Sequence, residues 1–92
     1  MPTATLSVLV TTPEGVLFSG AARHAIFPGE QGTFEILPLH RPLVSRLRPG
    51  AVVVGPQVWM IRAGVVSVMA DAVTAVVELH APVVGAGERV DT

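Results

Sequence analysis

The chain has 92 residues, room for one small domain, and a net charge of −1 at neutral pH. A balance this close to neutrality provides no electrostatic attraction for nucleic acid. Cysteine and lysine are both absent, which excludes disulfides, thiolate metal sites, a P-loop and Schiff-base chemistry.

Hydrophobic residues make up 50% of the chain, and charged residues only 14%, where about 25% is usual. A domain this small has a limited interior, so part of its outer surface is expected to be apolar and to mark a partner site. The alternative is a sequence that is merely rich in alanine and valine. No apolar stretch reaches the roughly 20 residues of a membrane span, and the first ten residues do not resemble a signal peptide.

Glycine and proline recur along the chain and favour short strands over helices. The first predicted strand covers residues 6–10 and returns, after a turn at 13–15, as residues 16–18. An extended segment at 21–27 then leads to a break at Pro28–Gly29. The remaining predicted strands cover residues 33–37, 43–47, 51–54, 58–62, 64–69 and 72–79, with hairpin turns at 55–57 and 70–71. Eight to ten short strands and no convincing helix predict a β-sandwich.

The last predicted strand alternates clearly between apolar and polar residues. Its core-facing residues are expected to be Val73, Ala75, Val77 and Leu79, and its outward residues Thr74, Val76, Glu78 and His80. Other strands, such as 51–54, are apolar on both faces. A free-standing antiparallel sheet usually has a polar outer face, so we expect one sheet surface to be covered by another chain.

No group of residues predicts catalysis, a metal site or a cofactor. The histidines at 24, 40 and 80 have no partner at a metal-ligand spacing, and the pair Glu78 and His80 supplies too few ligands for a site. Arginines at 41, 46 and 48 lack the interleaved aromatics of a nucleic-acid surface. Trp59 is expected to pack between the sheets, with an interface role as the alternative.

Three segments resemble a known family. They are Thr12–Gly20 (TPEGVLFSG), Phe27–Leu43 (FPGEQGTFEILPLHRPL) and Leu47–Gly50 (LRPG). In order and spacing they are similar to the epsilon subunit of the rotary ATP synthase. The resemblance implies an all-β fold, a flattened sandwich of two roughly five-stranded sheets over residues 1–81, followed by a flexible tail at 82–92.

The resemblance also implies a function. The family member is a non-catalytic subunit of the central rotor stalk, which couples the gamma subunit to the membrane-embedded c ring during ATP synthesis. It lies at the cytoplasmic face of the cell membrane, touches the membrane only through the c ring, and needs no cofactor. By position, the c-ring-facing loop is Gly29, Glu30, Gln31, Gly32 and Thr33, and the gamma-facing residues are Thr12, His40 and Ser45.

The chain also departs from the family pattern. Glu35 and Leu39 stand where the family usually has glycine, which questions the path of the backbone there. The C-terminal helical hairpin that inhibits ATP hydrolysis in bacterial members is missing, so the resemblance implies coupling without this regulation. The alternative function is a free-standing β-sandwich that binds a small ligand or a peptide, for example by adding a strand to a sheet edge.

Overall fold

The computed structural model describes residues 4–80, and this part of the chain contains eight β-strands and no helix. The all-β prediction is therefore confirmed. No helix in the described part could cross a membrane. The tail predicted at 82–92 lies outside the described residues. The strands are β1 (Leu6–Thr12), β2 (Gly15–Ala22), β3 (Ala25–Gly29), β4 (Gly32–Ile36), β5 (Leu43–Leu47), β6 (Gly50–Val54), β7 (Gln57–Met69) and β8 (Ala72–Leu79).

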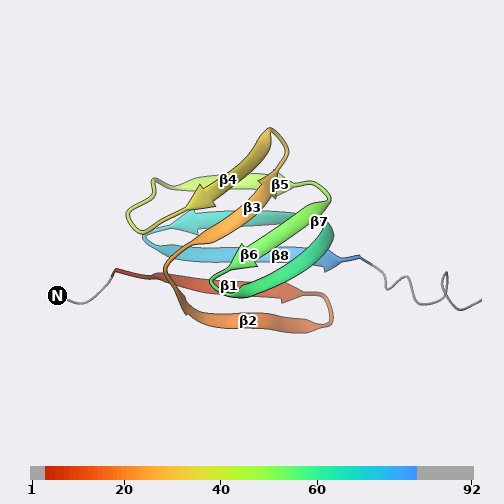
Figure 1. Ribbon diagram of the computed structural model, residues 1–92, viewed down its shortest axis with the longest axis horizontal. Coiled ribbons are helices and arrows are strands. Elements are labelled where there is room, and N and C mark those ends of the chain that lie inside the picture. The colour runs from red at the N-terminus through yellow and green to blue at the C-terminus, as the bar shows by residue number, and fades with distance from the viewer. Residues whose placement is uncertain (1–3, 81–92) are drawn as a thin grey trace, which may run out of the picture.

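The strands form two layers that share the long strand β7 (Figure 1). The first half of β7 pairs with β6, and its second half pairs with β5 and β8. One layer therefore has the order β2-β1-β8-β7-β5, and the other contains β4, β3, β6 and β7. Strands β3 and β5 meet only at the pair Gly29 and Leu47. The first and last strands, β1 and β8, run parallel to each other.

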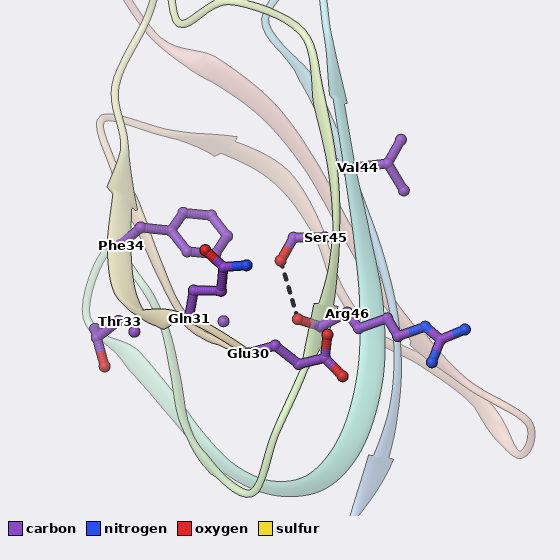
Figure 2. Close-up of a pocket in the computed structure, with 9 residues that line it drawn as sticks. Glu30, Gln31, Thr33, Phe34, Val44, Ser45 and Arg46 are labelled. Carbon is purple, nitrogen blue, oxygen red and sulfur yellow. Dashed lines mark hydrogen bonds between the residues drawn. The ribbon is translucent and has the colours of Figure 1, made fainter.

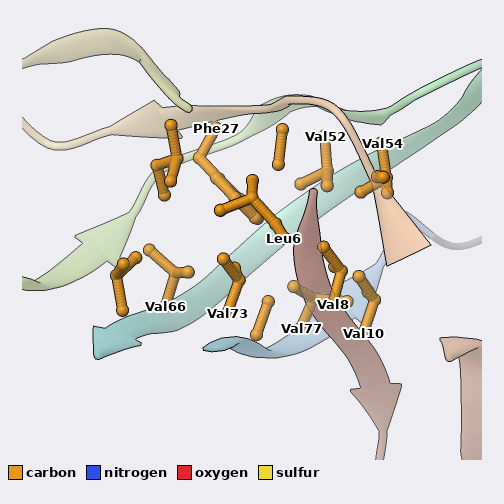
Figure 3. Close-up of a cluster of buried hydrophobic side chains, with 14 of the residues drawn as sticks. Leu6, Val8, Val10, Phe27, Val52, Val54, Val66, Val73 and Val77 are labelled. Carbon is orange, nitrogen blue, oxygen red and sulfur yellow. The ribbon is translucent and has the colours of Figure 1, made fainter. Parts of the chain in front are cut away.

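Apolar side chains from both layers fill the interior between them. Leu6, Val8 and Val10 of β1 lie opposite Phe27 of β3 and the β6 valines (Figure 3). Strand side chains alternate between the two faces of a sheet, so every second residue of β1 enters this core and its neighbours face outward. None of the described polar or charged residues is fully buried. Apolar burial is therefore the main source of stability.

The predicted pattern of β8 is confirmed for all but one inward position. Val73, Ala75 and Val77 are buried, whereas Leu79 is 41% exposed. Leu79 pairs with Ile61, beyond a register shift between Ile61 and Ala63. At that point β7 leaves for the second layer, so Leu79 lies at the margin of the core.

The predicted boundary between strands 58–62 and 64–69 was wrong. Residues 58–62 and 64–69 belong to one strand, β7, because the register shift bends the strand without ending it. A Cβ atom on Gly64 would lie 2.8 Å from the carbonyl oxygen of Val76, so glycine is needed for this close approach.

The segment predicted at 21–27 is divided between β2 and β3, since the chain crosses between the layers at Arg23 and His24. Strand β3 then continues through Pro28 to Gly29 instead of stopping before them. Strand β3 pairs with β6 only as far as Ile26. Pro28 has no N–H to donate, but no β3–β6 hydrogen bond is lost, because that pairing has already ended.

Trp59 packs against the core, as predicted. Its ring meets Phe18 of β2 edge-on, with 6.2 Å between the ring centroids and an angle of 62°. This is a favourable arrangement for two aromatic rings. It ties the first half of β7 to the edge strand of the other layer.

Candidate partner-binding surfaces

The predicted c-ring-facing loop is the tip of the β3–β4 hairpin. Glu30 and Gln31 form the exposed turn between Gly29 and Gly32. Gly32 has φ +134°, a conformation that side chains rarely adopt. A Cβ atom on Gly29 would lie only 2.7 Å from Cε1 of Phe34. Both glycines are therefore required by the geometry of the hairpin, which lies at one extremity of the molecule, opposite β2 (Figure 1).

This tip borders a polar hollow against β5, shown in Figure 2. The Glu30 N–H donates to the carbonyl oxygen of Arg46 at 3.1 Å, and the Arg48 N–H donates to that of Pro28 at 2.9 Å. The hydroxyl of Ser45 donates to the same Arg46 carbonyl at 2.9 Å. Ser45, predicted to face gamma, is thus placed beside the predicted c-ring loop. The lining residues are Gly29–Phe34 and Val44–Arg46.

The other two predicted gamma-facing residues lie at opposite ends of the first layer. The Thr12 hydroxyl accepts from the Glu14 N–H and donates to the Gly15 carbonyl, both at 3.1 Å, in the β1–β2 turn. His40 lies in the β4–β5 loop, where its N–H donates to the Leu37 carbonyl and its Nδ1 lies 2.7 Å from that of Arg41.

Hydrogen bonds join the β4–β5 loop to the β7–β8 turn, near the first residues of β1. The Leu39 N–H donates to the Asp71 carboxylate at 2.7 Å, and the Ser7 N–H donates to the Asp71 carbonyl at 2.8 Å. The structure therefore does not bring Thr12, His40 and Ser45 together. Their role as gamma contacts remains a prediction, as does that of the c-ring loop.

Glu35 and Leu39, the two residues at positions where the family usually has glycine, differ in backbone conformation. Glu35 is a regular member of β4, paired with Ile26, and its carboxylate lies 3.3 Å from Nδ1 of His24. The two groups are close enough for an ion pair but are not aligned for a hydrogen bond. Leu39, in contrast, adopts φ +72°, so a leucine occupies a conformation that favours glycine.

Nine neighbouring side chains on the outer surface of the first layer include no ionisable group, and we call this patch the uncharged face. Register places its members in a lattice three strands wide: Ser7, Ala72 and Met69 in one row, Leu9, Thr74 and Ser67 in the next, and Thr11, Val76 and Val65 in the third. The flanking strand β5 adds Val44 on the same side. Charged residues border the patch at Arg46, which pairs with Val65, and at Glu78, which follows Val76 on the outward side of β8. Five of these nine side chains are apolar and four carry hydroxyl groups, and coverage of a sheet face by another chain remains a prediction.

The described residues contain no arrangement suited to catalysis or metal binding. Glu78, considered as a possible ligand beside His80, lies 3.2 Å from the Arg62 guanidinium instead. No group of three or more potential ligands occurs among residues 4–80. The uncharged face and the exposed polar tip of the β3–β4 hairpin are therefore the candidate surfaces for binding a partner.

Comparison with known proteins places this chain in a family. Residues 5–82 match the family model described as ATP synthase, Delta/Epsilon chain, beta-sandwich domain. The chain belongs to this family. It is similar to the ATP synthase epsilon chain of a Nitratiruptor species, at 37% identity over 91% of this chain and 69% of that protein. It is 41% identical to the epsilon chain of Bordetella avium, over 77% of this chain but only 54% of that protein.

Solved structures share the fold at low sequence identity. A chain of the Euglena gracilis mitochondrial ATP synthase (OSCP/F1/c-ring) matches 99% of this chain and 58% of its own length, with a TM-score of 0.76 and 17% identity. A chain of the Tetrahymena thermophila mitochondrial ATP synthase (central stalk/c-ring) matches 85% of this chain and 66% of its own, with a TM-score of 0.70 and 13% identity. Like the Bordetella relative, these proteins extend well beyond the matched part.

Proposed function

We propose that this chain is a non-catalytic rotor subunit of an ATP synthase, which links the gamma subunit to the c ring during ion-driven ATP synthesis. Membership of the epsilon-chain family supports this function, and so does the fold shared with chains of ATP synthase structures. The position that follows is peripheral, at the cytoplasmic face of the membrane. The comparisons give no support to the alternative of a free-standing ligand-binding module.

The uncharged face is the observation that carries the proposal. Nine neighbouring side chains on β1, β7 and β8 include no charged group, and five of them are apolar. Together with the flanking strands, the layer is five strands wide, or about 20 Å at the spacing of neighbouring strands. A surface of this kind suits a permanent interface, since stable interfaces are depleted of charge at their centre. We assign it to gamma.

The hairpin tip suits a different partner. Its exposed residues Glu30, Gln31 and Thr33 are polar, as a contact with the polar loops of a c ring requires. The tip belongs to the second layer, and β7 runs through both layers. Torque received at the tip therefore passes to the uncharged face through continuous hydrogen-bonded, close-packed strands, which deform little.

A matched pair of variants on β7 tests the assignment of the uncharged face. Val65 lies on this face, and Val58 is similarly exposed on the outer side of the second layer. We expect Val65→Lys to weaken binding to purified gamma by about tenfold or more, because the ammonium group would be desolvated in the interface. Val58→Lys is expected to bind gamma as the wild type does. Equal affinities of the two variants would contradict the assignment.

Cross-linking tests the assignment of the β3–β4 hairpin tip to the c ring. The sequence has no cysteine, so a single introduced cysteine carries a unique label. In the assembled complex, Gln31→Cys is expected to cross-link to a c subunit and Val58→Cys is not. The same approach at Thr12, His40 and Ser45 shows which of these positions contacts gamma. Cross-linking of Gln31→Cys to gamma alone would reverse the assignment of the loop.

A further inference from the structure

Leu39 has an unfavourable backbone conformation and a side chain that is almost fully exposed. Its φ of +72° lies in the left-handed region, where a Cβ atom makes a steric clash that glycine avoids. Its side chain is 89% exposed, more than any other large apolar side chain among residues 4–80. Leu39 therefore destabilises the fold through its backbone conformation, and its exposed side chain gains little compensating burial within residues 4–80.

The surrounding structure holds Leu39 in this conformation. Its N–H donates to the Asp71 carboxylate at 2.7 Å, a short, charge-assisted hydrogen bond. Asp71 is itself fixed in the β7–β8 turn, and its carbonyl accepts the Ser7 N–H at 2.8 Å. On the other side, the His40 N–H donates to the Leu37 carbonyl at 3.1 Å and closes the turn around Leu39. Strain that is enforced in this way tends to occur at functional positions.

Leu39 also lies beside the uncharged face. Asp71, its hydrogen-bond partner, immediately precedes Ala72, which belongs to the row formed with Ser7 and Met69. Met69 is exposed at the same end. Leu39 therefore lies near one margin of the uncharged face, on a loop whose backbone is held by a hydrogen bond to the Asp71 side chain.

We propose that Leu39 is an anchor residue that inserts into an apolar pocket of gamma, at the edge of the contact made by the uncharged face. The inference rests on the proposed function and adds a specific contact to it. A protein pocket is the favoured occupant, because a side chain whose backbone is held rigidly before binding loses little conformational entropy in a protein interface. The chain's net charge of −1 and its lack of lysine give no attraction to an anionic lipid surface.

Replacement by glycine gives a sharp test, because stability and affinity are expected to change in opposite directions. Leu39→Gly removes the steric clash, so its melting temperature should equal or exceed that of the wild type. Its affinity for purified gamma should fall about tenfold or more, as for the loss of an interface anchor. Leu39→Asn, which tolerates the left-handed conformation, should lose affinity to a similar extent. Leu39→Met should retain it.

Matched controls separate the possible outcomes. Val58→Ala removes an exposed apolar side chain from the other layer and should bind gamma normally. Wild-type affinity of both Leu39→Gly and Leu39→Asn, with Val65→Lys impaired, would overturn the anchor and leave the proposed function intact. If the wild-type chain itself did not bind gamma, both proposals would fail. If Leu39→Gly lost only self-association in sedimentation, or only vesicle binding, the occupant would be a second copy or lipid and the proposal would be wrong.

Discussion

Gly29 lies directly beneath the ring of Phe34, so close that a Cβ atom would lie 2.7 Å from Cε1 of the ring and 2.9 Å from the Gly32 carbonyl. This contact fixes the shape of the β3–β4 hairpin. Phe34 in turn packs against Phe27 of the core, with 6.1 Å between ring centroids. The exposed tip is therefore tied to the interior through one glycine and two aromatic rings.

Gly29→Ala is expected to destabilise the fold by about 1–3 kcal/mol, as is usual for overpacking. The alanine methyl group must displace either the Phe34 ring or the backbone of the turn. Chemical denaturation measures the loss. The control is Gly20→Ala on β2, where the nearest atom to an added Cβ is 3.6 Å away, an ordinary contact. Equal stability of the two variants would show that the hairpin adapts more easily than its geometry indicates.

Neighbouring residues on β7 should differ strongly in their tolerance of truncation. Ile61 is fully buried, whereas Met60 is 54% exposed. Ile61→Ala is expected to cost about 2–5 kcal/mol, because it leaves a cavity between the layers. Met60→Ala is expected to stay within about 0.5 kcal/mol of the wild type. Denaturant midpoints of the two variants check this, and a large effect of Met60→Ala would mean that its outer face is covered in the isolated chain.

Ala70, in the β7–β8 turn, has a strained backbone conformation that another residue type would adopt more easily. Ala70 and Asp71 have φ values of +50° and +63°, as the tight turn of this hairpin requires. Alanine adopts this region poorly, whereas asparagine tolerates it. Ala70→Asn is expected to stabilise the fold by about 1 kcal/mol and to raise the melting temperature by about 4–8 °C. A lower melting temperature would show that the Ala70 methyl group has a packing role.

The free edge of β2 is expected to associate with other chains. Residues 15–22 contain no charged residue and no proline, and within residues 4–80 this strand pairs with β1 alone. Unguarded edges of this kind promote pairing between sheets. The isolated chain should therefore self-associate at high concentration, and Ser19→Lys should shift it toward the monomer in sedimentation velocity experiments. A wild-type chain that remains monomeric at millimolar concentration would contradict this expectation.

Local patterns in the sequence predicted the strands well where burial alternates regularly. The run Val73, Ala75, Val77 is an example, because each residue's surroundings follow directly from the period of two. The same reasoning divided β7 into two strands, 58–62 and 64–69, with an interruption at Ala63. The interruption is a bulge at which one strand passes from one layer to the other, and that depends on the pairing of three other strands with β7.

The candidate surfaces could be predicted only in part. Low charge and strands that are apolar on both sides predicted that a partner covers one face, which stays a prediction. The uncharged face itself depends on the register between β1, β7 and β8, which no local pattern contains. The resemblance identified the hairpin tip through its glycines. It did not show that Ser45 lies beside this tip, or that Thr12 and His40 lie at opposite ends of a sheet. The left-handed backbone at Leu39 has no signal in the local pattern, but the resemblance pointed to this position, because the family usually has glycine there.

The parallel pairing of β1 with β8 has a consequence for biosynthesis. Strand β1 leaves the ribosome first, yet one of its two partners is β8, the last strand to be made among residues 4–80. Until that strand emerges, the nascent chain holds only the β1–β2 hairpin on that side, and an isolated hairpin is marginally stable in water. We therefore expect the sandwich to close only after synthesis has passed residue 79, which leaves the unfinished protein dependent on chaperones or on early capture by its partner.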